Sequence, residues 1–188
     1  FNGSIRLEAI ESLSSEHDGG DNLEPYGDIK IHLKGTTYTI FTLLNASNFN
    51  IINGKKEYIS GSGNNASIGG VACTTGDGPE LNLENVQDFF ISINFTEKDS
   101  GNPDDPFFTF SGTKYGEEGN VLVGYTSSIS SITNHRIQES LDRLKRGASH
   151  EERFFVDIYR VYNKKSRGRL DFYDSPETLR LHFVINLN

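Results

Sequence analysis

Short runs of alternating apolar and polar residues recur along this chain and restrict its fold more than any other feature. The run Asp88–Thr96 is the cleanest, with Phe89, Ile91 and Ile93 on one face. A period of two residues is typical of a strand with one buried face. Further strand-like runs are Ser4–Leu13, Tyr26–Leu33, Thr37–Leu44, Val71–Thr74, Phe107–Thr113, Val121–Ser127, Phe154–Tyr162, Arg169–Tyr173 and Leu179–Leu187. The pattern predicts an all-β fold, a two-sheet antiparallel β-sandwich with one short helix and long polar loops.

The helix is predicted at Thr133–Gly147, where Ile137, Leu141 and Leu144 fall on one face. Gly147 follows the last apolar residue of the pattern and is typical of a helix end. Strand and helix do not alternate regularly, which argues against a parallel α/β sheet. We therefore expect residues 1–188 to form a single β-sandwich domain, with a helix-containing insertion at about residues 130–150.

Two turn signals are expected to organise the middle of the chain. Asn53-Gly54 predicts a hairpin between Ile51-Ile52 and Tyr58-Ile59. The glycine- and asparagine-rich stretch Gly61–Gly70 predicts a flexible surface connection.

Composition excludes several classes of protein. The net charge of -8 argues against nucleic-acid binding and against direct attraction to an anionic membrane surface. Cys73 is alone, which excludes an internal disulfide framework and favours a buried, inert thiol. The chain starts at Phe1 in a strand-like run, so we expect a processed or excised part of a longer protein, with a secreted or cell-surface location favoured.

Two acidic segments, His17–Tyr26 and Thr96–Pro106, each lie between two strand-like runs. Their carboxylates are Asp18, Asp21, Glu24, Glu97, Asp99, Asp104 and Asp105. Clustered carboxylates repel one another, and a divalent cation relieves that repulsion. Ca²⁺ in particular takes about six to eight oxygen ligands in a flexible geometry. The alternative interpretation is a pair of solvated turns, because Asp, Asn and Gly are good turn residues.

The spacing within these segments resembles that of a known family. Asp18, five residues and then Glu24-Pro-Tyr resemble the first calcium loop of the calcium-dependent lipid-binding sandwich first described as the second conserved region of protein kinase C. Glu97, Asp99 and Asp105 match the offsets of that family's third loop, Asp-x-Asp followed by a further Asp. The resemblance covers about residues 4–113 and leaves residues 45–79 poorly matched.

The resemblance implies a function and a set of ligands. It implies a non-catalytic calcium-binding module for membrane or partner recognition, reaching lipid through calcium. Two of the implied ligands are Glu where the family mostly has Asp, and the tip Ser100–Pro103 lacks the basic or bulky apolar residues that the family often inserts into lipid. The implied Ca²⁺ ligands are Asp18, Glu24, Glu97, Asp99 and Asp105, with Asp21 and Asp104 as additional candidates.

Another functional class remains open. The abrupt start and the polar, Asn- and Gly-rich loops also suit a receptor- or membrane-recognition domain of a secreted bacterial protein, such as a pore-forming toxin or an adhesin. That alternative needs no calcium, and its partner would be a receptor or a glycan. An enzyme is not predicted, because the five His have no zinc-ligand spacing and no Gly-x-Ser-x-Gly motif occurs.

A basic turn is the remaining candidate binding feature. Lys164, Lys165 and Arg167 lie between two predicted strands, and we expect them to bind a partner. Arg143, Lys145 and Arg146 near the end of the predicted helix are expected to extend the same basic patch, whose partner would be a protein or an anionic headgroup.

Overall fold

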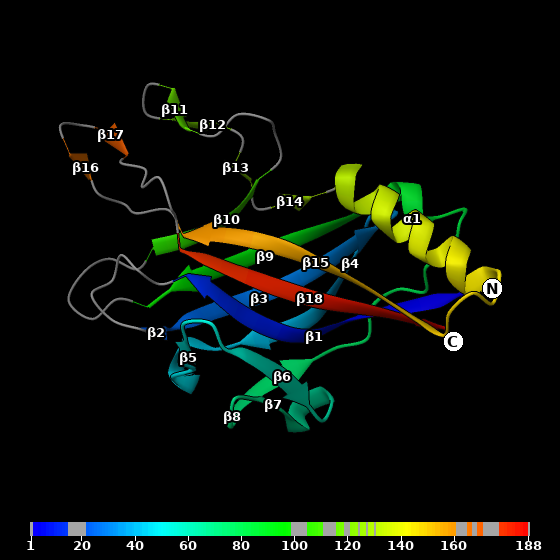
Figure 1. Ribbon diagram of the computed structural model, residues 1–188, viewed down its shortest axis with the longest axis horizontal. Coiled ribbons are helices and arrows are strands. Elements are labelled where there is room, and N and C mark those ends of the chain that lie inside the picture. Colours follow the sequence, from blue (N-terminus) through cyan, green and yellow to red (C-terminus); the bar gives the residue numbers. More distant parts are fainter. Residues whose placement is uncertain are drawn as a thin grey trace.

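The computed structural model describes residues 2–14, 22–98, 105–110, 116–118, 121–123, 125–126, 128–129, 131–160, 165–166, 169–170 and 177–187. Strands dominate this part of the chain, and its one α-helix is α1 (Ser131–Lys145) (Figure 1). The all-β prediction with one helix is therefore confirmed for these residues.

The main sheet closes on itself as an antiparallel barrel of ten strands. Closure comes from the pairing of Asp105 with Glu97 and of Pro106 with Thr96. The predicted two-sheet β-sandwich is therefore wrong. In ring order the strands are β10 (Asp105–Phe110), β15 (Glu151–Arg160), β18 (Thr178–Leu187), β1 (Gly3–Ser14), β6 (Lys56–Ser60), β7 (Ala66–Ile68), β8 (Val71–Thr75), β4 (Thr36–Leu43), β3 (Pro25–Leu33) and β9 (Phe89–Glu97).

The barrel consists of two long-paired groups joined by short pairings. Strands β15, β18 and β1 pair along most of their lengths, as do β4, β3 and β9. The joins through β10 on one side and through β6, β7 and β8 on the other involve only two or three residue pairs at each step. Alternation reveals the buried face of a strand and not its neighbours, so a sandwich and this barrel have the same pattern.

The middle of the chain forms one of these joins, which differs from the hairpin that Asn53-Gly54 predicts. The turn exists, because Lys55 N donates to Ile52 O and Gly54 has a φ of 80°. However, β5 (Ile51–Ile52) pairs with β2 (Asn22–Leu23), and β6 pairs with β1 instead. Likewise the predicted flexible connection contains β7, which links β6 to β8.

A non-strand segment, residues 76–81, runs beside β1 and β4 where those strands lack a β-ladder partner. Gly76 N donates to Ile40 O of β4, and Leu81 and Gly3 exchange both backbone hydrogen bonds. A Cβ at Gly76 would lie 2.2 Å from Thr39 O, so this close approach requires glycine. The segment therefore satisfies backbone groups that the open ladder leaves exposed.

The interior of the barrel is filled by aliphatic and aromatic side chains. Helix α1 lies across the end where β1 starts and β18 ends (Figure 1). Its predicted apolar face, Ile137, Leu141 and Leu144, is buried as expected. A Cβ on Gly3 would lie 3.0 Å from Leu141 Cδ2, which shows how closely α1 covers this end.

The end of α1 is a Schellman motif. Gly147 has a φ of 71°, its N–H donates to Leu144 O, and Ala148 N donates to Arg143 O. This confirms the stop signal that the sequence contains at Gly147. No helix among the described residues is long and apolar enough to cross a membrane.

The remaining elements are short. They are β11 (Gly116–Glu118), β12 (Val121–Val123), β13 (Tyr125–Thr126), β14 (Ser128–Ile129), β16 (Lys165–Ser166) and β17 (Arg169–Leu170), with 3₁₀ turns η2 (Asn45–Ser47), η3 (Gly63–Asn65) and η4 (Val86–Asp88). β13 and β14 pair with β10 and β9, respectively, while β11 pairs with β12 and β16 with β17.

Candidate functional site

Both acidic segments are attached to strand ends at the end of the barrel opposite α1, which we call the loop end. Pro25 at the start of β3 pairs with Glu97 at the end of β9, and Glu97 pairs with Asp105 at the start of β10. Ser14, the last residue of β1, pairs with Thr178 at the start of β18. The chain therefore leaves the first acidic segment, and enters and leaves the second, at neighbouring strand ends.

Four buried polar side chains form a layer inside the loop end. Ser12 and Glu177 are fully buried, while Glu97 and Arg160 are each 2 % exposed. Ser12 lies on β1, and Glu177 directly precedes β18. Glu97 and Arg160 are the last residues of β9 and β15. These strands meet at the loop end. Apart from Ser140 and Thr178, the other buried side chains in the described part of the chain are apolar, so this polar layer marks the loop end as chemically distinct.

An ion-pair network organises the layer around Arg160. Its Nη1 lies 2.7 Å from Glu177 Oε2, and its Nη2 lies 3.6 Å from Glu97 Oε2. The backbone reinforces the first pair, because Arg160 N donates to Glu177 O at 2.9 Å. Two buried carboxylates thus share one guanidinium, and removal of that guanidinium would leave buried charge uncompensated.

Glu97 also joins the two acidic segments directly. Glu24 N donates to Glu97 Oε1 at 3.0 Å, and Lys98 N donates to Glu24 O at 3.0 Å. Lys98 Nζ also donates to Asn48 Oδ1 at 2.8 Å, which connects Lys98 to the residue that follows η2. These bonds fix Glu97 and Lys98, the last described residues before position 99, against Glu24, the residue that precedes β3.

Ser12 Oγ and Glu177 Oε1 in this layer have no hydrogen-bond partner among the described residues. An unsatisfied buried oxygen is costly. Glu177 Oε1 can therefore accept a further hydrogen bond.

The predicted calcium ligands fall into two groups. Asp18, Asp21, Asp99 and Asp104 lie outside the described residues. Glu24 and Glu97 are brought into contact, as described above, and Asp105 is placed opposite Glu97 by strand register. Of the predicted partner-binding residues, Lys165 begins β16, while Lys164 and Arg167 also lie outside the described part of the chain.

The contacts of Glu97 argue against its use as a calcium ligand. One carboxylate oxygen accepts from Glu24 N and the other faces the Arg160 guanidinium. A cation at Glu97 would therefore meet the positive charge of Arg160. Where the structure describes side chains, no group of three or more His, Cys, Asp or Glu is arranged to hold a metal ion.

Arg160 and Glu177 are not among the site residues that the sequence pattern predicts. Arg160 occupies the inward position after Phe154, Val156 and Ile158, and Glu177 precedes Leu179 with the same two-residue spacing. A charged residue at an inward-facing position of an alternating strand was the available signal, because such a charge must find a partner.

The basic residues of α1 also have described contacts. Arg143 Nε forms an ion pair with Glu152 Oε1, and Arg146 pairs with Asp142 one turn before it. These pairs lie at the α1 end of the barrel, whereas β15 runs from Glu152 towards Arg160 at the loop end. From Arg160 the chain continues to the segment that contains Lys165. Arg143 and Arg146 therefore lie at the opposite end of the barrel from the point where the chain enters that segment.

No family model, no curated protein and no solved structure matches this chain.

Proposed function

We propose that this chain is a non-catalytic recognition module whose loop end binds Ca²⁺. The observation that carries the proposal is the pairing of Pro25 with Glu97 and of Glu97 with Asp105, which anchors both acidic segments at neighbouring strand ends. Seven carboxylates belong to those segments. Their mutual repulsion favours a bound divalent cation.

The geometry favours a division of roles among these carboxylates. Glu97 acts as a positioning residue, because its oxygens already bind Glu24 N and face Arg160. Calcium ligation is assigned to Asp18, Glu24, Asp99 and Asp105, with Asp21 and Asp104 as additional ligands. Carboxylate oxygens are the ligands that Ca²⁺ prefers in proteins.

Membrane recognition through calcium is the accompanying proposal. Leu44 and Ile52 are 66 % and 50 % exposed, and both lie next to the loop end, since Leu43 pairs with Gly27 and Ile52 pairs with Asn22. These apolar side chains supply what the tip Ser100–Pro103 lacks for contact with lipid. The net charge of -8 requires a cation to bridge the module to an anionic surface.

A thermal melt in Ca²⁺ and in EDTA tests the calcium proposal. Ligation favours the folded state by RT ln(1 + [Ca²⁺]/Kd), or about 2.7 kcal/mol at a hundredfold excess over Kd. Asp99→Asn should abolish the calcium-dependent rise in Tm and leave the melt in EDTA unchanged or slightly higher, because repulsion is relieved. Asp77→Asn, an exposed acid in the 76–81 segment, is the matched control and should keep the rise.

Vesicle sedimentation tests the membrane proposal separately. Vesicles that contain phosphatidylserine should bind the parent protein in Ca²⁺ and release it in EDTA, and Leu44→Ser should weaken that binding without changing the calcium-dependent Tm. If the parent shows no calcium-dependent Tm shift at millimolar Ca²⁺, both proposals fail and the acidic segments are solvated turns. Charge reversal at Lys164 and Lys165 in the same assay tests the proposed basic binding site.

A further inference from the structure

The sequence contains two Asn-Gly dipeptides, Asn2-Gly3 and Asn53-Gly54. Asparagine is a chemically labile residue. A glycine after it adds to the lability, because no side chain shields the glycine nitrogen, which can attack the amide carbon of the asparagine side chain. The same dipeptide thus occurs twice in one chain, and the structure places the two copies in different surroundings.

Asn53-Gly54 occupies the tip of an exposed turn. Both residues are exposed, and Lys55 N donates to Ile52 O at 3.0 Å to close the turn. Gly54 has a φ of 80°, whereas the φ of Asn53 is negative, a combination typical of a type II turn. A Cβ on Gly54 would meet no atom within 4 Å, so the space around the turn is open. Since glycine adopts both signs of φ, the peptide plane between Asn53 and Gly54 can rotate towards the geometry of attack.

One hydrogen bond opposes that attack. Gly54 N donates to Ser12 O at 2.8 Å, so this bond must open before the nitrogen can react. A backbone hydrogen bond at the surface contributes modestly to stability, because water replaces the partner that is lost. The bond should therefore slow the reaction roughly twofold to tenfold relative to the unfolded chain, and should not prevent it.

Asn2-Gly3 is held much more firmly. Gly3 is buried, and it exchanges both backbone hydrogen bonds with Leu81, at 2.7 and 2.8 Å. A Cβ on Gly3 would lie 3.0 Å from Leu141 Cδ2, so this dipeptide has little room to change conformation. The side-chain amide of Asn2 also donates to Glu80 Oε2 at 3.0 Å. Attack by Gly3 N therefore requires part of the barrel to open.

We propose that Asn53 is a site of spontaneous deamidation in the folded protein and that Asn2 is protected. Gly54 N forms a bond to Cγ of Asn53, the Cγ–Nδ2 bond breaks, and the proton of Gly54 N leaves with the side-chain nitrogen as ammonia. Water then opens the resulting succinimide ring at either carbonyl and yields aspartate or isoaspartate at position 53. Either product adds one negative charge to a net charge of -8. The reaction needs no oxidant, reductant or enzyme, and it does not depend on calcium or lipid.

The turn matters to the barrel because it is attached to β1 at the loop end. Ser12 N donates to Lys55 O at 3.0 Å, in addition to the bond that Ser12 O accepts from Gly54 N, and Ser12 belongs to the buried polar layer. Beside this turn, β1 and β6 share only three residue pairs. Isoaspartate inserts an extra methylene into the main chain and should disrupt the bonds of the turn, whereas aspartate leaves the main chain unchanged.

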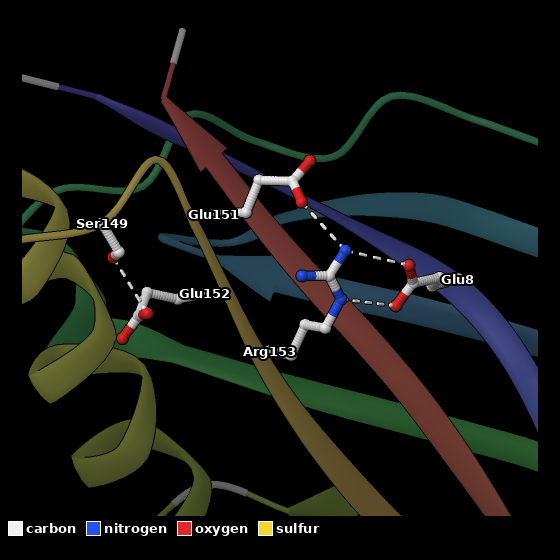
Figure 2. A network of polar contacts seen from close by, with 5 residues as sticks. All are labelled: Glu8, Ser149, Glu151, Glu152 and Arg153. Atoms are coloured by element: carbon white, nitrogen blue, oxygen red, sulfur yellow. Dashed lines mark hydrogen bonds and ion pairs between the residues drawn. The ribbon is translucent and has the colours of Figure 1, made fainter.

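The opposite side of β1 does not depend on the turn. There β18 pairs with β1 from Gly3 to Ser14, and Arg153 of β15 makes two parallel bonds to Glu8, at 3.0 and 3.2 Å (Figure 2). Isoaspartate at position 53 should therefore loosen the join between β1 and β6 without unfolding the barrel.

Peptide mapping by mass spectrometry tests the proposal within a single chain. The purified protein is incubated at neutral pH in native buffer and, in parallel, in urea. In urea the two dipeptides should convert at rates within about threefold of each other, because the fold no longer distinguishes them. In native buffer Asn53 should convert at least roughly tenfold faster than Asn2. Equal native rates, or a native rate at Asn53 more than about a hundredfold below its rate in urea, would overturn the proposal.

Matched variants separate the consequences of the two products. Asn53→Gln keeps a side-chain amide but would need a six-membered ring, so its Tm should not change on incubation. Asn53→Asp carries the new charge on a normal main chain. The incubated parent, which contains isoaspartate, should melt at a lower temperature than fresh Asn53→Asp and should exchange the Ser12 amide hydrogen faster. Equal Tm values and equal exchange would overturn the inferred loosening of β1 and β6.

Discussion

Arg160 Nη1 lies 2.7 Å from Glu177 Oε2, and both side chains are buried inside the loop end of the barrel. Glu97 Oε2 lies 3.6 Å from the same guanidinium. The arrangement places one positive and two negative groups where water has little access. Replacing Arg160 and replacing Glu177 should therefore lower the free energy of unfolding by different amounts.

Replacement of Arg160 should cost more stability than replacement of Glu177. Arg160→Met leaves two carboxylates buried and should lower the free energy of unfolding by about 3–5 kcal/mol. Glu177→Gln retains size and one carbonyl oxygen while Arg160 keeps Glu97, so the expected loss is about 1–3 kcal/mol. Urea denaturation measures both, and the opposite ranking would contradict a network centred on Arg160.

Gly27 is a second sensitive position, in a strand that is paired on both sides. Its φ is 144°, and a Cβ would lie 1.8 Å from Asn94 O, a backbone atom of the neighbouring strand. Gly27→Ala should therefore lower the free energy of unfolding by roughly 2–4 kcal/mol. Gly35→Ala separates dihedral strain from the clash, because Gly35 has a φ of 79° with no atom within 4 Å, and should cost about 1 kcal/mol. Equal losses in urea melts would refute the clash.

The Glu8–Arg153 pair should make stability depend on pH in the acidic range. The hydrogen bond from Arg153 holds the pKa of Glu8 below its ordinary value of 4.5, despite the opposing effect of burial. A lowered folded pKa stabilises the fold above pH 4.5, and this contribution is lost as pH falls through the folded pKa. Because Arg153 is 54 % exposed, solvent limits the contribution to about 0.5–1 kcal/mol. Glu8→Gln should remove this part of the acid dependence, as measured by Tm against pH.

Cys73 should be chemically inert in the folded protein. It is 5 % exposed, which confirms the buried thiol expected from the sequence, and burial raises the pKa of its thiol. The rate of reaction with a disulfide reagent should be low in buffer and should rise sharply in urea. A matched control, Ala72→Cys combined with Cys73→Ser, places the thiol at the exposed neighbouring position and should react rapidly without denaturant. Fast labelling of native Cys73 would contradict its burial.

The secondary structure was determined largely by local sequence. The alternation around Ile91 and Ile93 yields β9, the apolar spacing of Ile137 and Leu141 yields α1, and Gly147 ends that helix. These features depend on residues within a few positions of each other, where periodicity and turn chemistry act. They are visible without knowledge of the rest of the chain.

Strand pairing and the polar layer were decided by tertiary structure. The two-residue pairing of β10 with β9 closes the barrel, and nothing in the alternation of either strand specifies the other as its neighbour. Arg160 and Glu177 are 17 residues apart and meet only because β15 and β18 lie side by side. The sequence by itself determined which faces of the strands are apolar and where the acidic segments lie. Only the closed sheet, through contacts between distant residues, decided that the anchors of both segments share one end of the barrel and that Glu97 faces a guanidinium.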